Sequence, residues 1–296
     1  MKVFLTGATG FIGSVLVPEL LSAGHEVLGL TRSDGGAEAL RAAGAQVHRG
    51  DLEDLDSLRQ GAAQSEAVIH TAFNHDFTNF LAACEQDRRV IQALSEGLKG
   101  KDGPLLITSG TGIGNREPGQ PALEKYGPDP NHPHPRAASE LAGQAALDAG
   151  INVSIVRLPQ VHDHHKQGLL TPAIELAQRT GKFAYLGDGS TRWPAAPVQD
   201  VARLYRLVLE RGERGSRWNA VAEEGITSKE IAEVLGQGLG LPVVSLTPAE
   251  SQQHFGWLAP FMAMDMLASS AYTRATLNWQ PTGPGLISDL KKMTGL

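Results

Sequence analysis

Short apolar runs alternate along the first half of the chain with longer segments whose apolar residues recur at helical spacing. Runs with the length of a buried strand occupy residues 3–5, 26–31, 45–48, 67–70, 105–109 and 152–157. Helices are predicted over residues 12–21, 37–43, 77–98 and 135–147. Because short strands that alternate with helices build a parallel sheet covered on both faces, the pattern predicts a Rossmann-like, doubly wound α/β fold.

The pattern becomes less regular in the second half of the chain. Helices are predicted over residues 171–180 and 201–211, with Asp200 as a candidate N-cap of the second, and a short strand over 241–244. Short helices and loops are expected elsewhere after residue 216. The chain is long enough for two lobes, so we predict that a smaller C-terminal α/β lobe accompanies the sheet domain.

A glycine-rich turn joins the first predicted strand to the first predicted helix. Gly7 permits a tight turn, Gly10 lets the backbone approach a pyrophosphate, and Gly13 lets the helix pack close to the strand. The N–H groups at the start of the helix attract phosphate oxygens. The stretch therefore predicts a dinucleotide-binding loop, whose contact residues we assign as Gly7, Thr9, Gly10, Phe11, Ile12 and Gly13.

The end of the second strand bears on the choice of dinucleotide. An acidic residue there would bind the ribose hydroxyls of NAD, but the sequence has Thr31, Arg32 and Ser33. The Arg32 guanidinium suits a 2′-phosphate, which favours NADP over NAD. The alternative interpretation is that Arg32 is a solvated surface charge, and Asp34 lies close by.

Further cofactor contacts are expected where the third and fourth strands end. Asp51, followed by Leu52, is placed to accept a hydrogen bond from an adenine amino group, or alternatively to cap the next helix. Thr71 and Ala72 follow the fourth strand, whose carboxyl end should lie beside the cofactor. Phe73 comes next and is a candidate substrate contact.

Composition narrows the classes of function. The net charge of −6 does not favour a nucleic-acid-binding surface, and the single Cys84 excludes an intrachain disulfide or a multi-cysteine metal site. No stretch of 18 apolar residues occurs, so no membrane segment is predicted and a cytoplasmic protein is expected. The run His162–His165 contains metal-ligand types, but consecutive residues seldom converge on one ion, so no metal is expected.

Several of these segments together resemble the extended short-chain dehydrogenases/reductases, the NAD(P)-dependent epimerase/dehydratase group. The resemblance rests first on Thr6–Gly13, on Asp51 with Leu52, and on the strand that ends at Thr108 and Ser109. It continues through Val156–Val161, Gly187–Gly189, Asp200–Ala202 and Asn278–Pro281. The resemblance implies that Pro159 passes the nicotinamide and that substrate binds between the two lobes.

The catalytic pair of that family is altered in this sequence. The family uses a Tyr as proton donor or acceptor and a Lys four residues later, which lowers the Tyr pKa and holds the nicotinamide ribose. Aligning the helix by Ser139 and Glu140 places His132 at the Tyr position and Arg136 at the Lys position. His132 can exchange a proton near neutral pH, whereas Arg136 can donate hydrogen bonds but does not titrate usefully.

Other candidates surround this altered pair. The family's Ser or Thr that polarises the substrate carbonyl corresponds here to Ser109 or Thr111, although an ordinary strand-to-loop turn is the alternative. His132 is alternatively a structural or solvent-facing histidine. His162 and Trp193 are candidate substrate contacts; solvent exposure is the alternative for His162, and a core position is the alternative for Trp193.

The resemblance implies a domain plan and three functions. Residues 1–157, with a return at about 183–211, would bind the dinucleotide, and residues 158–182 and 212–296 would form the substrate lobe. The leading function is an NADP-dependent oxidoreductase for a small carbonyl or alcohol. The alternatives are a non-catalytic NADP-binding sensor or interaction protein and a sugar-nucleotide epimerase or dehydratase. A small molecule is the expected partner, with no nucleic acid or membrane, and a homodimer through helices 77–98 and 136–149 fits the family.

Overall fold

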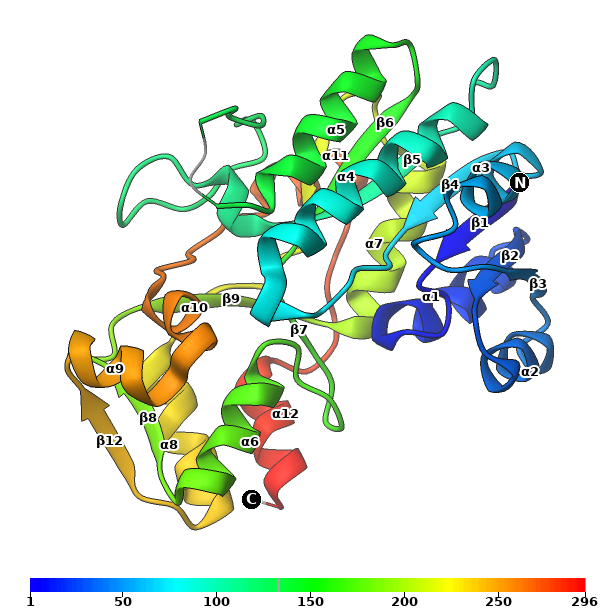
Figure 1. The fold of residues 1–296 in the computed structure, drawn as a ribbon. Helices are drawn as coiled ribbons and strands as arrows, with labels where there is room; N and C mark the ends of the chain where they lie inside the picture. Colours follow the sequence, from blue (N-terminus) through cyan, green and yellow to red (C-terminus); the bar gives the residue numbers. More distant parts are fainter. Residues whose placement is uncertain (132–133, 296) are drawn as a thin grey trace.

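A parallel sheet of seven strands forms the centre of the molecule in a computed structural model, which describes residues 1–131 and 134–295 (Figure 1). The strand order is β10-β6-β5-β4-β1-β2-β3. The strands are β1 (Lys2–Thr6), β2 (Glu26–Thr31), β3 (Gln46–Arg49), β4 (Ala67–His70), β5 (Leu105–Gly110), β6 (Val153–Leu158) and β10 (Arg217–Asn219). The order reverses direction after β1, beside β4, and a crevice at such a reversal is where doubly wound folds bind their ligands.

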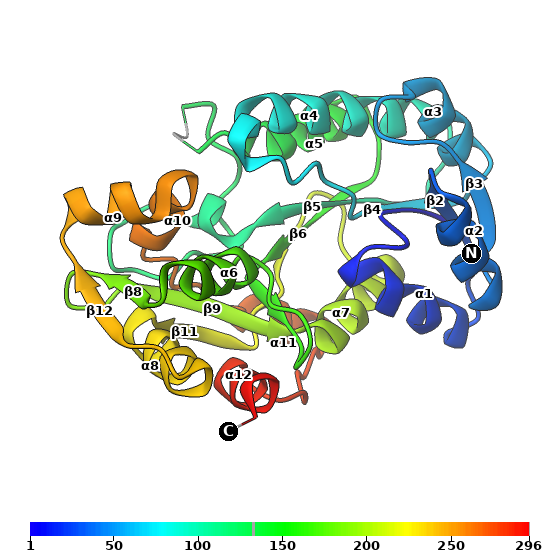
Figure 2. The ribbon, with the colours of Figure 1, turned by 60° about the horizontal axis from the view of Figure 1, so that its bottom comes forward.

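Helices cover both faces of this sheet, which confirms the predicted Rossmann-like fold. Figure 2 shows α3, α4 and α5 on one face and α1 and α7 on the other. These helices are α1 (Phe11–Ser22), α3 (Leu55–Ala63), α4 (Phe80–Gly97), α5 (Ala137–Asp148) and α7 (Val198–Arg211), and α2 (Asp34–Ala42) lies beside β2 and β3. Helix α7 packs against α1, although most strands of the sheet lie between these two helices in the sequence.

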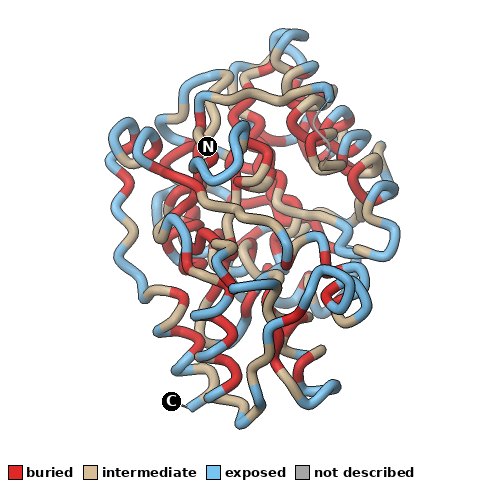
Figure 3. The backbone as a smooth tube through the Cα atoms, turned by 90° about the vertical axis from the view of Figure 1, so that its left-hand side faces the viewer, coloured by how far each residue is buried: buried red, intermediate tan, exposed pale blue. Residues whose placement is uncertain are grey.

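The alternation of side chains along β1 explains how both faces are filled. Val3 and Leu5 point into the cluster that includes α1 and α7, whereas Phe4 points into the cluster beneath α3 and α4. All three side chains are fully buried. Figure 3 shows that buried backbone runs through the interior and that exposed segments lie at the turns and outer helix faces.

A smaller α/β lobe packs below the carboxyl edge of the sheet. It contains a three-stranded sheet of β7 (Gln160–His162), β9 (Arg192–Pro197) and β11 (Glu223–Thr227), and the parallel pair β8 (Phe183–Leu186) and β12 (Val243–Leu246). Its helices are α6 (Leu170–Thr180), α8 (Ser228–Leu239), α9 (Pro248–Phe255), α10 (Ala259–Ala263) and α12 (Leu286–Thr294), whereas α11 (Ala271–Leu277) packs against α7 and β10. Within the described part of the chain, no helix is long and apolar enough to cross a membrane.

Two sequence interpretations in the second half are corrected by the structure. Asp200 is not an N-cap, because α7 begins at Val198 and the buried Asp200 carboxylate accepts from the backbone N–H groups of Thr282 and Gly283. Residues 217–219 are not a loop but the edge strand β10, which pairs with β6. The range 183–211 is the predicted return of the chain to the sheet domain. In the structure, α7 of this range lies against α1, whereas β8 pairs with β12 in the smaller lobe.

Candidate functional site

The glycine turn after β1 has the geometry that its sequence predicts. Gly7 has a φ of +70°, which favours glycine, and its carbonyl accepts from the N–H of Gly10 at 2.8 Å. A Cβ on Gly13 would lie 2.0 Å from the Gly7 carbonyl oxygen, so α1 packs directly against the turn. No side chain among the described residues caps α1, and its first-turn N–H groups remain available to an anion.

The end of β4 closes against this turn. The Thr71 hydroxyl donates to the Thr6 carbonyl at 2.8 Å, and the Ala72 N–H donates to the Thr6 hydroxyl at 3.3 Å. A Cβ on Gly7 would lie 2.7 Å from both the Thr71 hydroxyl and the Ala72 nitrogen. Thr71 and Ala72 therefore line the same narrow gap as the glycine turn, between two parallel strands.

Arg32 lies on the surface at the end of β2. The described residues provide it with no ion pair, whereas the neighbouring Asp34 is paired with Arg49. The Ser33 hydroxyl accepts from the Gly36 N–H at 3.1 Å and caps α2. Arg32 and Arg49 therefore place two cations here against the single Asp34, which makes the end of β2 suitable for an anionic group.

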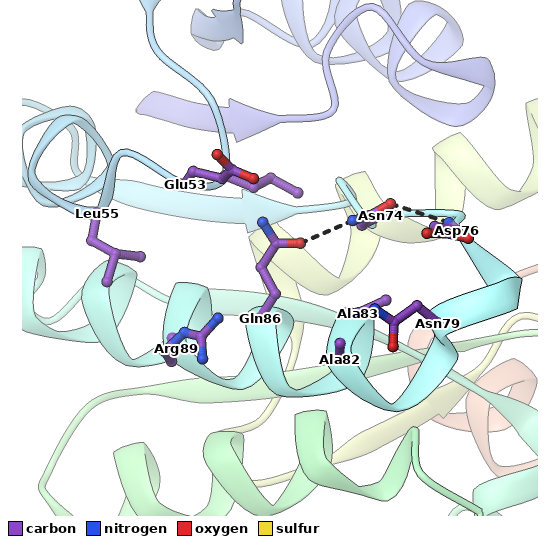
Figure 4. A pocket seen from close by; sticks show the side chains of 10 residues that line it. Glu53, Leu55, Asn74, Asp76, Asn79, Ala82, Ala83, Gln86 and Arg89 are labelled. Atoms are coloured by element: carbon purple, nitrogen blue, oxygen red, sulfur yellow. Dashed lines mark hydrogen bonds between the residues drawn. The ribbon is translucent and has the colours of Figure 1, made fainter.

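Asp51 does not cap the next helix, which rejects the alternative considered from the sequence. Its carboxylate accepts from the N–H groups of Glu53 at 2.8 Å and Asp54 at 3.2 Å, while Asp54 itself caps α3. Leu52 lines a cavity of about 310 Å³ between this loop and α4. In Figure 4, Gln86 of α4 reaches across the cavity wall to Asn74, with a hydrogen bond of 3.2 Å.

A buried polar network connects the ends of β1, β4 and β5. The Thr6 hydroxyl contacts His70 Nδ1 at 2.6 Å, and His70 Nε2 contacts Asp87 at 3.0 Å. Asp87, on α4, also accepts from Arg136 Nη1 at 2.7 Å and from the Ser139 hydroxyl at 2.6 Å. Burial raises the pKa of Asp87, but Arg136 and His70 outweigh it and lower that pKa to about 2.

This network places Arg136 beside the carboxyl end of the sheet. Arg136 Nη2 donates to the carbonyl of Thr108 at 2.9 Å, at the end of β5. Its guanidinium carbon lies 4.0 Å from the centre of the Phe73 ring, so the cation stacks over an aromatic face. Its side chain is 12% exposed, so part of it remains accessible to solvent.

The two candidate carbonyl partners follow Thr108, whose carbonyl binds the Arg136 guanidinium, along the chain. Ser109 follows Thr108 on β5 and is 3% exposed, and its hydroxyl has no hydrogen-bond partner among the described residues. Thr111 opens a short 3-10 helix, η2 (Thr111–Gly114), and is also 3% exposed. An unpaired buried hydroxyl is costly, so Ser109 retains hydrogen-bonding capacity for a ligand.

Other predicted site residues lie elsewhere. His132 falls outside the described residues. His162 is fully buried at the end of β7, where its Nδ1 contacts Asp289 at 2.8 Å and burial lowers its pKa, so the solvent-exposed interpretation is wrong. Trp193 is 1% exposed in the core of the smaller lobe. Neither His162 nor Trp193 presents surface to the cleft, and the geometry does not support them as substrate contacts. Pro159 is half-buried between β6 and β7.

Comparison with known proteins relates this geometry to a family. The model of the NAD dependent epimerase/dehydratase family matches residues 3–220, which contain the glycine turn, Arg136 and all of the seven-stranded sheet except Lys2. The chain belongs to this family. An uncharacterized protein of Schizosaccharomyces pombe is 44% identical over 293 residues, covering 98% of each chain.

Relatives with a named activity are more distant. The 2-alkyl-3-oxoalkanoate reductase of Stenotrophomonas maltophilia is 26% identical over 262 residues, covering 82% of this chain and 77% of the relative. The solved UDP-glucose 4-epimerase of Thermus thermophilus, in complex with NAD, is 23% identical with a TM-score of 0.77, covering 100% of this chain and 98% of that one. The family thus includes both reductases and epimerases on one fold.

Membership of the family does not by itself explain the buried network around Asp87. Asp87 and His70 are not among the site residues predicted from the sequence, although one signal was present. Asp87 occupies the same face of α4 as the buried Cys84, Ile91 and Leu94, and an acid in an apolar stripe requires a partner. No group of three or more metal-ligating side chains lies together within residues 1–131 and 134–295.

Proposed function

We propose that this protein is an NADP-dependent oxidoreductase that reduces a carbonyl compound or oxidises the corresponding alcohol. The observation that carries the proposal is the position of Arg136, which Asp87 and the Thr108 carbonyl hold beside the unpaired Ser109 hydroxyl. When bound, the reduced dinucleotide supplies a hydride to the carbonyl carbon and is itself oxidised, and the carbonyl oxygen takes up a proton.

The residues of the glycine turn fit the pyrophosphate of such a cofactor. The space that a Cβ would fill at Gly7 and Gly13 is occupied by backbone, and the helix N-terminus is uncapped among the described residues. The exposed Lys166, from the loop after β7, brings its Nζ within 5.5 Å of the centre of the Phe11 ring. A cation from the smaller lobe therefore adds to the helix N-terminus at the expected position of the phosphates.

The preference for NADP rests on the charges at the end of β2. Arg32 is free of ion pairs within the described structure, and Arg49 neutralises Asp34, so a 2′-phosphate meets no unpaired carboxylate there. We assign Arg32 to the 2′-phosphate, Asp51 and Leu52 to the adenine, and Thr71 and Ala72 to the central part of the cofactor. Charge-assisted hydrogen bonds to phosphate favour this arrangement.

The reacting end of the site would combine Arg136 with hydroxyl groups. We assign Arg136 to the nicotinamide ribose hydroxyls and Ser109 or Thr111 to the substrate carbonyl, and Pro159 lies on the nicotinamide side. Arg136 stays protonated and cannot itself exchange a proton with the substrate, so His132 is the proposed proton donor. Phe73, which stacks under Arg136, is the proposed substrate contact nearest to the reacting atoms.

Cofactor titration tests the proposed preference for NADP over NAD. The Kd values of NADPH and NADH are measured by quenching of protein fluorescence, with Arg41→Ala on the exposed end of α2 as the matched control. Arg32→Ala is expected to raise the Kd of NADPH about tenfold, the factor for about 1.4 kcal/mol, and to leave NADH unchanged. Equal Kd values for both dinucleotides in the unmodified protein would reject the NADP assignment.

Turnover tests the proposed oxidoreductase function against the sensor alternative. NADPH oxidation is followed with a panel of aldehydes and ketones, and with His132→Gln and Ser109→Ala variants. The oxidoreductase proposal requires turnover with at least one carbonyl compound and a loss of at least tenfold in kcat in one variant. Tight NADPH binding without turnover of any carbonyl would instead support the non-catalytic alternative, which the missing Tyr and Lys favour.

A further inference from the structure

Aromatic side chains from both lobes meet where the start of α4 contacts α10. The segment between β4 and α4 contributes Phe73, Phe77 of the 3-10 helix η1 (Phe77–Asn79), and Phe80. The smaller lobe contributes Trp257 of η3 (Gly256–Leu258) and Phe261 of α10. In Figures 1 and 2 the N-terminal end of α4 lies beside α10. We call these five side chains the aromatic wall.

The rings of the aromatic wall are in continuous contact. Phe73 lies 6.1 Å from Phe80, and Phe80 lies 5.6 Å from Phe77, measured between ring centres. Phe77 and Trp257 are stacked at 4.8 Å with their planes 2° apart. Phe261 contacts Phe77 at 5.8 Å and Phe80 at 5.9 Å. The wall thus extends without interruption from Phe73 to Trp257 and Phe261.

The inner end of this wall touches the proposed reaction site. Phe73 lies under the guanidinium of Arg136 at 4.0 Å, and Arg136 in turn reaches the end of β5. On the opposite side, a Cβ on Gly112 of η2 would lie 3.5 Å from the methyl carbon of Met264. A substrate whose carbonyl lies between Ser109 and Arg136 therefore extends along aromatic and methionine side chains.

The wall is incompletely buried, which distinguishes it from ordinary core packing. Phe73, Phe77, Phe80 and Phe261 are all half-buried, and Trp257 is 38% exposed. A contiguous exposed apolar surface next to a polar site is characteristic of a ligand-binding wall. The tight stack between Phe77 and Trp257 also shows that the rings are presented in a defined orientation.

We propose that the aromatic wall binds the planar, apolar part of the substrate, so that aromatic or conjugated aldehydes and ketones are the substrate class. This inference rests on the proposed oxidoreductase function. Flat rings offset-stack on Phe and Trp faces, whereas a saturated ring of the same size has no π-face to stack.

Matched substrates test the proposal directly. Benzaldehyde is compared with cyclohexanecarboxaldehyde, which has a saturated ring of similar size, and with glycolaldehyde, which is too small to reach the wall. The variants are Phe77→Ala and Trp257→Ala, and Tyr272→Ala is the control, because Tyr272 is an aromatic residue 44% exposed on α11 that stacks on Trp218. Initial rates at saturating NADPH give kcat/KM for each pair.

The expected result is selective. The unmodified protein should favour benzaldehyde over cyclohexanecarboxaldehyde, and each wall variant should lower kcat/KM for benzaldehyde about 2- to 12-fold, the range for one aromatic contact. Glycolaldehyde can contact only Phe73 at the inner end of the wall, so its turnover should change less than twofold in the Phe77 and Trp257 variants, and Tyr272→Ala should change nothing. Equal kcat/KM for the two ring aldehydes, or an equal loss on all three substrates, would overturn the proposal and identify the wall as a contact between lobes only.

A binding experiment keeps this inference separate from the proposed catalytic function. Trp257 is 38% exposed, whereas Trp193, Trp218 and Trp279 are each at most 1% exposed, so acrylamide quenching reports mainly on Trp257. Benzyl alcohol added to the protein with NADP should protect against quenching, cyclohexylmethanol should protect less, and Trp257→Phe should remove the effect. Protection without turnover of any carbonyl compound would reject the proposed oxidoreductase function but support the aromatic wall as a binding surface. Absence of protection rejects the wall.

Discussion

Replacing Asp87 by Asn tests whether the buried network holds the candidate site together. Asp87 is 2% exposed, and its carboxylate contacts His70, Arg136 and Ser139 within 3.0 Å. Arg136 and Ser139 both donate to it. An Asn side chain keeps the shape but turns an N–H₂ group toward one of these donors, and it removes the charge that balances Arg136.

The expected loss of stability follows from the electrostatics of this site. A fall of the Asp87 pKa from an ordinary 3.8 to about 2 corresponds to about 2 kcal/mol of stabilisation of the ionised form. Removing one partner of a buried ion pair costs about 3–5 kcal/mol, and the 12% exposure of Arg136 favours the lower end. We therefore expect Asp87→Asn to lower the free energy of unfolding by about 3 kcal/mol at pH 7.

Urea unfolding at several pH values measures this effect. Because folding lowers the pKa of Asp87, its contribution is present above the unfolded pKa near 4 and is lost as pH falls towards 2. The difference between the unmodified protein and Asp87→Asn should therefore shrink across that window. Glu85→Gln, which removes a surface pair with Arg88 on the same helix, is the control and should change stability by less than about 1 kcal/mol. A loss below about 1 kcal/mol for Asp87→Asn, with an unchanged urea dependence, would refute the reasoning.

Three further outcomes are expected. Gly13→Ala places a Cβ 2.0 Å from the Gly7 carbonyl oxygen, so we expect a cost of about 1–3 kcal/mol in urea unfolding and at least tenfold weaker NADPH binding in fluorescence titration. Glu140→Gln leaves the fully buried Arg157 unpaired and should lower the unfolding free energy by about 3–5 kcal/mol in the same assay, and an unchanged midpoint would contradict this. Cys84 is 1% exposed and burial raises its pKa to about 11, so a thiol reagent at pH 8 should label it only after denaturant is added; rapid labelling of the native protein would show that the site opens.

The parts of the site that depend on one short segment were predictable from the sequence. The glycine turn combines a strand, three glycines and a helix start within eleven residues, and its backbone geometry is a local property. The contact of Thr71 and Ala72 with that turn followed from parallel topology alone, because β1 and β4 end at the same edge of the sheet. The fold class followed in the same way from the alternation of strands and helices.

The parts of the site that depend on distant partners were not predictable. Asp87 and Arg136 are 49 residues apart, and no local pattern shows that an acid on α4 meets a cation at the start of α5. The Phe77–Trp257 stack joins two lobes whose relative placement the sequence does not encode in any single segment. Likewise β10 has only three residues, which is too short for an alternating pattern to be recognised in the sequence. It is a strand because it pairs with β6.

The position of β10 also affects how the protein can be made. Residues 217–219 follow β7, β8, β9 and α7 in the sequence. During synthesis the edge of β6 that pairs with β10 therefore stays unpaired until all of these elements have been made. Before α7 emerges, the face of the sheet beside α1 also lacks its cover. A fragment truncated at residue 157 would expose both the strand edge and the apolar face and should aggregate on expression. A fragment that keeps the seven-stranded sheet intact must therefore include residues 217–219.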